Sequence, residues 1–151
     1  ELGSVVHAQE ADLSGARLIG VEGDRSIIQA PNANASGANN HSVYAFNHSV
    51  IDVSYADLSG SVVGGIRAEH GCLINAAESD ISGGGPGGIA VNAVHGSIVN
   101  VAFANCRREP GIDNPSDISI TGGAIVVLRD TLGGTDVTPN TLLPQGIIFD
   151  E

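Results

Sequence analysis

Hydrophobic residues along this chain recur at fixed positions within a unit of about 23 residues. Five segments align without internal gaps, and they begin at residues 4, 26, 49, 72 and 97, which are 22, 23, 23 and 25 residues apart. Within each segment the apolar positions lie two residues apart, shift phase once, and then continue two apart. This alternation predicts a strand, a corner and a second strand in every segment.

A repeat of this length with two or three short strands is typical of a parallel β-helix, whose turns stack at about 4.8 Å. Four columns carry mostly small or branched residues and should point into the core; in the third segment they are Ile51, Val53, Ala56 and Leu58. We therefore predict an all-β, right-handed parallel β-helix of about five to six turns. Leucine-rich repeats would need a consensus that is absent, and the pentapeptide pattern, which fits residues 11–15, does not persist.

A shorter apolar run precedes each later segment, and length variation falls in the link between this run and the next segment. Examples are residues 43–45, 65–68 and 88–91. The β-helix turns should span residues 1–108. A Pro/Gly/Asn-rich break follows, so we expect residues 109–151 to form a last modified turn, a cap and an oligomer contact. In that part, residues 133–141 read as a loop before a final strand at 146–149.

The position directly after each segment start is a branched aliphatic residue. These residues are Val5, Ile27, Val50, Leu73 and Ile98. Strand alternation points them away from the core, and an exposed stripe of this size exceeds what a soluble monomer usually carries. We expect the same stripe on neighbouring subunits around a threefold axis to cover it. The alternative is a corner position that is partly buried within its own chain.

Polar columns supply the candidate site residues. The position eight residues after each start reads Asp12, Asn34, Asp57, Asp80 and Asn105. Such side chains can form a structural ladder, but Asp57 and Asp80, on adjacent turns, could also be paired glycosidase carboxylates or hold a cation. Tyr55 and Glu78, again one turn apart, are a candidate carbohydrate contact, with an ordinary surface tyrosine as the alternative.

Charge and composition narrow the partners. The chain of 151 residues has 17 acidic residues against 6 basic ones, a net charge of −11, which disfavours nucleic acid as a partner. The longest apolar run, residues 124–128, is too short to cross a bilayer, so we expect no membrane insertion. Aromatic residues make up only 3% of the chain, as suits a narrow core of stacked small residues.

Cysteines and histidines give no case for a cofactor. Cys72 and Cys106 fall at apolar positions of the repeat, so we expect buried thiols rather than a disulfide framework. His48, His70 and His95 should lie near one edge, but their offsets differ by one residue and no other ligand joins them consistently. We predict polar turn residues there and no metal site.

The repeat, written generically as Gly-Ser-Ile-Ile-Asn-Ala-x-x-Ala-Asn-x-Ser-Gly, resembles the β-helix repeats of bacteriophage tailspikes and tail fibres. The segment Gly-Gly-Thr-Asp-Val-Thr-Pro-Asn-Thr at 133–141 looks like the carboxy-terminal ending of some of those chains. The resemblance implies a homotrimer in the virion tail, assembled in the host cytoplasm, that binds and often cleaves a bacterial surface polysaccharide, O-antigen or capsule. Because this chain begins inside a repeat and without Met, we expect it to be the carboxy-terminal portion of such a spike.

Two rival hypotheses stay open at this point. The first is a polysaccharide depolymerase, either a glycoside hydrolase or a lyase, that uses Asp57 and Asp80; otherwise we expect any such activity in the parent protein, outside this chain. The second is a bacterial surface adhesin or a secreted pectate-lyase-like β-helix. The acidic charge makes a neutral O-polysaccharide a more favourable ligand than a strongly anionic capsule.

Overall fold

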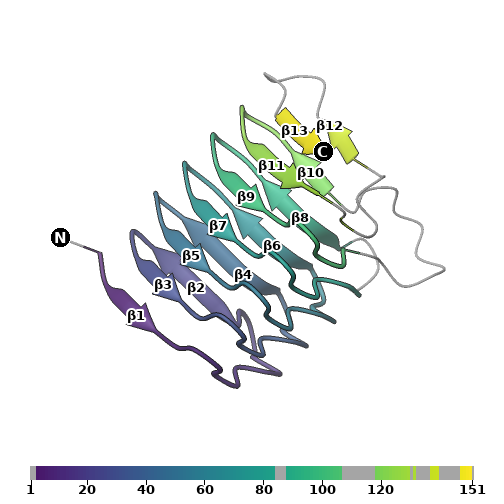
Figure 1. Cartoon of the computed structure of the whole chain (residues 1–151). Helices are drawn as coiled ribbons and strands as arrows, with labels where there is room; N and C mark the ends of the chain where they lie inside the picture. Colours follow the sequence, from purple (N-terminus) through teal and green to yellow (C-terminus); the bar gives the residue numbers. More distant parts are fainter. Residues whose placement is uncertain are drawn as a thin grey trace.

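The computed structural model describes residues 3–83, 88–106, 118–129 and 131, together with the strand backbones at 137–139 and 147–150. This part of the chain is an all-β parallel solenoid without a helix (Figure 1). The predicted fold class is therefore confirmed, while its right-handed sense stays a prediction.

Two parallel sheets run along the solenoid, and each strand pairs with the equivalent strand one turn before or after it. The first sheet contains, in spatial order, β1 (Val5–His7), β3 (Ile27–Gln29), β5 (Val50–Asp52), β7 (Leu73–Asn75), β9 (Ile98–Asn100), β11 (Ile125–Leu128) and β13 (Ile147–Asp150). The second contains β2 (Val21–Asp24), β4 (His41–Phe46), β6 (Gly64–Ala68), β8 (Ile89–Ala93), β10 (Ile118–Ile120) and β12 (Val137–Pro139).

The core consists of the columns that the sequence pattern predicts. In the third segment Ile51, Val53 and Leu58 are fully buried, and Ala56 is 2% exposed. Each layer of such residues stacks directly on the next, so a ring in one layer would have to be accommodated by every neighbouring layer. This explains why the described aromatic side chains all lie outside the core.

The second strand of each segment is shorter than predicted. It is reduced to one residue per turn in parallel pairing, as between Asp57 and Asp80. The backbone is extended only briefly there because Tyr55, two residues earlier, has a left-handed φ of 58°. Two residues later, the N–H of Ser59 donates to Oδ1 of Asp57 at 3.0 Å and begins the next turn.

Strands are also present after residue 108, in the part for which a last modified turn is predicted. β10 and β11 pair in register with β8 and β9, which confirms one more turn after the five segments. The prediction of a loop over residues 133–141 was wrong, because Val137–Pro139 forms β12 on β10. The sheet edge provides unpaired backbone groups, and this pairing outweighs the local turn preference; proline is tolerated on an edge strand. The predicted final strand is confirmed as β13 on β11. A cap and an oligomer contact at 109–151 stay predictions.

Candidate functional site

The corner ridge is a row of residues that project from the same corner on five successive turns. Its members are Glu10, Asn32, Tyr55, Glu78 and Phe103. All five have a left-handed backbone conformation with φ between 57° and 59°, which costs a non-glycine residue about 1 kcal/mol. Hydrogen bonds between turns hold this backbone; the N–H of Tyr55, for example, donates to the carbonyl of Ala77 at 2.9 Å.

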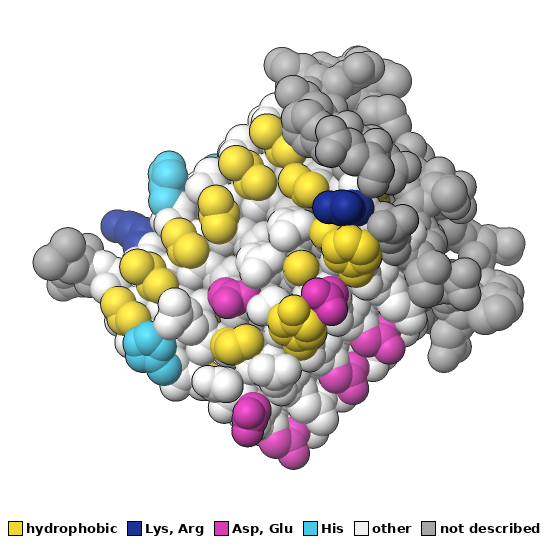
Figure 2. Space-filling view, viewed as in Figure 1, with side chains coloured by type: hydrophobic (Ala, Val, Ile, Leu, Met, Phe, Trp, Pro, Cys, Tyr) yellow, Lys and Arg dark blue, Asp and Glu magenta, His cyan; other side chains and the backbone are white. Residues whose placement is uncertain are grey.

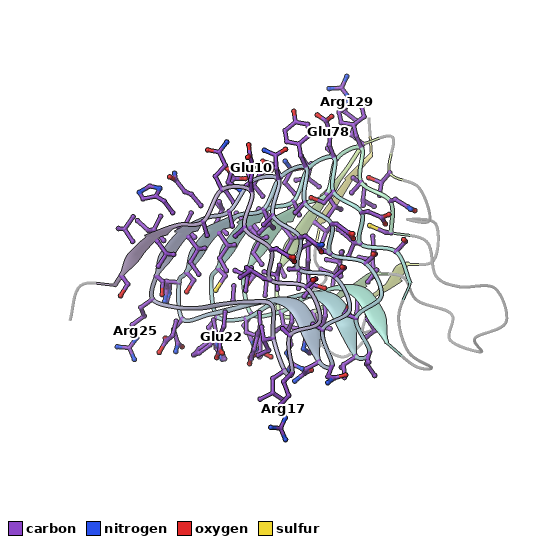
Figure 3. All side chains as sticks on the ribbon, turned by 90° about the horizontal axis from the view of Figure 1, so that it is seen from below. Glu10, Arg17, Glu22, Arg25, Glu78 and Arg129 are labelled. Carbon is purple, nitrogen blue, oxygen red and sulfur yellow. The ribbon has the colours of Figure 1, made fainter. Side chains whose placement is uncertain are left out.

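Tyr55 and Glu78, the predicted carbohydrate contact, are neighbours on this ridge and both are exposed. A hydrogen bond to the Glu78 carboxylate, together with the charge of that carboxylate, raises the pKa of Tyr55. Phe103 follows one turn later, and the Arg129 guanidinium lies 5.4 Å from its ring centroid. Figure 3 shows Glu78 and Arg129 on the same side of the solenoid. The ridge thus brings together two rings and a carboxylate, and their binding of a sugar stays a prediction.

The acidic ladder places Asp57 and Asp80 on adjacent turns, as predicted. Its members are Asp12, Asn34, Asp57, Asp80 and Asn105. Oδ1 of Asp57 accepts hydrogen bonds from the N–H and the hydroxyl of Ser59, at 3.0 and 2.6 Å. Oδ1 of Asp80 accepts from the N–H of Ser82 at 3.0 Å and from Nδ2 of Asn105 at 3.2 Å. These bonds close a turn and join two turns, which is a structural role; a catalytic role stays a prediction.

The aliphatic stripe crosses the outer face of the first sheet. It consists of Val5, Ile27, Val50, Leu73 and Ile98, whose exposed fractions lie between 38% and 58%. Parallel pairing sets these residues side by side, and Ile125 continues the row. Figure 2 shows the row as a diagonal band of hydrophobic side chains. The outward orientation is therefore confirmed, while the trimer contact stays a prediction.

An amide ladder lies beside the aliphatic stripe, two residues further along each strand. Nδ2 of Asn75 donates to Oδ1 of Asp52 at 3.0 Å, and Nδ2 of Asn100 donates to Oδ1 of Asn75 at 2.9 Å. The outer face of the first sheet therefore carries one apolar and one polar column, and both repeat from turn to turn.

Sequence reasoning missed a cluster on the outer face of the second sheet, which we call the aromatic network: His41, Tyr44, Phe46, Arg67 and Glu69. The rings of Tyr44 and Phe46 lie 5.2 Å apart and are tilted by 38°. The guanidinium of Arg67 lies 5.6 Å from the Tyr44 ring centroid. The Tyr44 hydroxyl donates to Oε2 of Glu69 at 3.0 Å, and Nε of Arg67 donates to Oε1 of Glu69 at 2.7 Å, with a second donation from its terminal nitrogen.

A signal for this network is present in the sequence. Tyr44 and Phe46 lie two residues apart in a strand, so they share one face, as do Arg67 and Glu69. The spacing of 23 residues between Tyr44 and Arg67 matches the repeat, and these two residues pair directly in the structure. The network therefore follows from applying the same period to the run that precedes each segment.

Burial and charge shape the ionisation of the network. Burial would raise the pKa of Glu69, but hydrogen bonds from Arg67 and Tyr44 and the Arg67 charge outweigh it and hold that pKa below its usual value. Burial, and then the charge of Arg67, lower the pKa of His41. Burial and Glu69 raise the pKa of Tyr44. The ionised form of Glu69 and the neutral forms of His41 and Tyr44 are thus favoured.

His41 is the most buried member of the network, at 6% exposed. A Cβ at Gly64 would lie 2.5 Å from the carbonyl oxygen of Ile89 and 3.3 Å from Cδ2 of His41, so this glycine allows the close approach of β8 and also leaves room for the imidazole. Nδ1 of His41 is buried and has no hydrogen-bond partner among the described residues. An unsatisfied polar atom of this kind is uncommon in a purely structural cluster.

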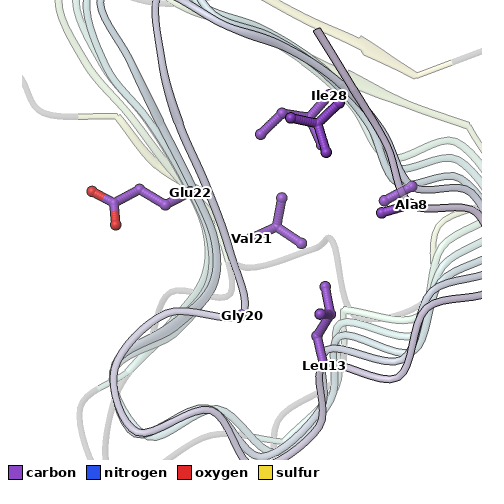
Figure 4. Close-up of a pocket in the computed structure, with 8 residues that line it drawn as sticks. Ala8, Leu13, Gly20, Val21, Glu22 and Ile28 are labelled. Atoms are coloured by element: carbon purple, nitrogen blue, oxygen red, sulfur yellow. The ribbon is translucent and has the colours of Figure 1, made fainter. Parts of the chain in front are cut away.

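One pocket of about 230 Å³ lies at the amino-terminal end of the solenoid (Figure 4). Its lining is almost entirely apolar and includes Val6, Leu13, Val21 and Ile28. These residues belong to the columns that form the core in later turns. The pocket is therefore the end of the core, without the convergent polar groups of a ligand site.

The remaining sequence predictions concern thiols and histidines. Cys72 and Cys106 are buried thiols, as predicted. The imidazole rings of His70 and His95 stack on one another, with their centroids 4.9 Å apart. Among the described residues no three His, Cys, Asp or Glu side chains gather as metal ligands, and no helix there could span a membrane.

Comparisons of the chain with protein-family models, curated proteins and solved structures give no match. The firm result is a parallel β-solenoid with an exposed aliphatic stripe and two surface groups that contain aromatic side chains.

Proposed function

We propose that this chain is a subunit of a trimeric β-helix that supports attachment to a bacterial surface polysaccharide, as the carboxy-terminal part of a phage tailspike. The aliphatic stripe is the observation that carries this proposal. Fully burying a Val, Leu or Ile side chain contributes roughly 1.5–3 kcal/mol, so a straight row of five half-exposed residues favours association. Closed cyclic symmetry would cover the stripe on every subunit at once.

The corner ridge supports the polysaccharide part of the proposal. Tyr55 and Phe103 are 57% and 49% exposed in a chain with few aromatic residues, and Glu78 lies between them. Their backbone is strained, yet none of the five ridge positions is the glycine that would relieve the strain. Retention of large side chains at strained positions is consistent with a contact that needs them.

Light scattering on the purified chain at micromolar concentration tests the assembly. We expect three times the monomer mass for the wild type and for Gln29→Asn, and a monomer for Ile27→Asn. Ile27 and Gln29 both face outward from β3, so this control places the same new residue on the same face. A monomeric wild type would overturn the trimer, and failure of the trimer to bind any bacterial surface polysaccharide would overturn the attachment role.

A depolymerase is the second candidate, favoured by the direct pairing of Asp57 with Asp80. Adjacent turns lie about 4.8 Å apart, close to the roughly 5 Å that separates the carboxyl groups of retaining glycosidases. The test is incubation with capsule or O-polysaccharide and assay of new reducing ends or unsaturated sugars. Activity that is lost in Asp57→Asn but kept in Asp12→Asn would establish it, whereas no products from the wild type would exclude it.

A further inference from the structure

We propose that the aromatic network on the outer face of β4 and β6 binds an uncharged bacterial polysaccharide, with sugar rings packed against Tyr44 and Phe46. This inference rests on the proposed attachment function and adds to it a second contact face and the charge class of the ligand. Glu22, which pairs with Tyr44, lies on the opposite side of the solenoid from Glu78 of the corner ridge (Figure 3). The two surfaces are therefore separate.

The two rings form a small platform. Tyr44 and Phe46 come from the same face of one strand, their centroids are 5.2 Å apart, and both are half-buried. Part of each side chain is open to solvent, and the C–H face of a sugar can pack against an aromatic surface of this kind. The described part of the chain has few other aromatic rings, so the presence of two on one strand marks this face as a candidate binding surface.

The platform is held rigidly before any ligand arrives. The Tyr44 hydroxyl is fixed by its hydrogen bond to Glu69, and the Arg67 guanidinium, itself fixed by Glu69, lies 5.6 Å from the Tyr44 ring centroid. Because these side chains have already lost rotamer freedom, binding would cost little additional entropy. Such preorganisation is a feature of binding sites as much as of stable folds.

Polar groups flank the platform. Glu69 uses both carboxylate oxygens within the network, whereas Arg67 has five N–H groups and donates from only two of its nitrogens to Glu69. Asn92 pairs with Arg67 one turn further, and Glu22 pairs with Tyr44 one turn before. An apolar surface with a few donors and acceptors around it suits a molecule with hydroxyl groups on its edges.

Charge selects the class of polysaccharide. Arg67 is neutralised by Glu69, and Asp24 and Glu22 add negative charge on the same sheet face. Nε of Arg25 lies 3.6 Å from Oδ1 of Asp24 and offsets its charge, and Figure 3 shows Arg17 on the same side of the solenoid as Glu22. In a chain of net charge −11, the overall electrostatic field disfavours the approach of uronate-rich or phosphorylated polymers. The ligand class that remains is a neutral polysaccharide.

The experiment measures retention of the trimer on a printed panel of purified O-polysaccharides and capsules, both neutral and uronate-bearing. We expect the wild type to bind at least one neutral polymer, and Tyr44→Ala/Phe46→Ala to weaken that binding about tenfold or more. Tyr44→Phe/Phe46→Tyr keeps both rings and should stay within about threefold of the wild type. Circular dichroism confirms that each variant retains its β structure.

The ridge variant Tyr55→Ala/Phe103→Ala separates the two proposals. If it loses binding while Tyr44→Ala/Phe46→Ala does not, the network is not a contact and the proposed attachment function stands. If both lose binding, both faces contact the polymer. A wild type that binds only uronate-bearing polymers overturns the neutral class, and one that binds no polymer overturns the attachment function together with this inference.

Discussion

The outer faces of the two sheets differ in whether the same kind of residue recurs on every turn. On the first sheet, every turn presents a branched aliphatic residue at the stripe position, with an amide or a carboxylate beside it on β5, β7 and β9. On the second sheet the equivalent outward row changes at every turn, from Glu22 to Tyr44, Arg67 and Asn92. A repeated row suits contact with another repeated row, whereas a varied row defines one place along the rod. This difference supports the two proposals, self-assembly through the first face and ligand recognition on the second.

The largest expected effect is on the free energy of unfolding, and it should differ between inward and outward residues of the first sheet. Ile74→Ala removes a side chain that is 1% exposed and should lower the free energy of unfolding by about 2–5 kcal/mol. Leu73→Ala, on the adjacent outward residue, should cost less than half as much. Urea unfolding monitored by circular dichroism gives both values. Both substitutions are made in the monomeric Ile27→Asn background, where the proposed subunit contact does not contribute. Equal losses there would mean that the stripe is part of the chain's own core.

A smaller effect should show that the second face is structurally held. Glu69→Ala removes the partner of both Tyr44 and Arg67 and should cost about 1–3 kcal/mol, because the Glu69 side chain is only 14% exposed. Glu22→Ala, on the same sheet and exposed, should change stability by less than about 0.5 kcal/mol. If both variants matched the wild type in thermal unfolding, the network would not be rigid.

The pH dependence of stability should report the same network. The pKa of Glu69 is held below its usual value of 4.5, so the unfolded chain binds the proton more tightly than the folded one does. The stabilisation is complete above pH 4.5 and is lost as the pH falls through the folded-state pKa. Melting temperatures measured between pH 6 and 3 should fall less steeply for Glu69→Gln than for the wild type. Parallel curves for the two proteins would contradict the assigned interaction.

The smallest expected effect concerns the corner ridge. Asparagine tolerates the left-handed conformation better than tyrosine, and Asn32 already occupies the equivalent position with a φ of 57°. Tyr55→Asn should therefore leave the free energy of unfolding unchanged or raise it by up to about 1 kcal/mol, while it weakens polysaccharide retention. A clear loss of stability would show that the Tyr55 side chain holds the corner instead of serving a ligand.

The inward columns were predictable because a repeat constrains them five times over. Ile51 and its equivalents could be assigned to the core from their period alone. The second strand of each segment was harder to predict, since its length depends on a left-handed backbone conformation at positions such as Tyr55, which are not glycine. Local composition also gave a wrong prediction at Val137–Pro139. The surrounding residues favour a turn, but pairing with β10 places this segment in a strand.

The candidate site was predicted only in part. Tyr55 and Glu78 lie inside the aligned segments, so their one-turn separation could be read directly. Tyr44 lies in a run that precedes a segment and Glu69 directly follows such a run, where insertions change the distance to the next segment. Their contact at 3.0 Å depends on side-chain conformations that a pattern of apolar positions does not contain.

Each turn pairs only with the turns before and after it, so the solenoid can gain or lose whole turns, and its length then changes in fixed steps. Removing residues 49–71 would join one segment to the next, shorten the rod by about 4.8 Å and leave every inward column in register. The same deletion would remove Arg67 and Glu69, so Tyr44 would lose its hydrogen bond to Glu69 and its contact with the Arg67 guanidinium. The length of the solenoid can thus change without loss of the fold, whereas a binding site built from two adjacent turns depends on those two turns staying next to each other.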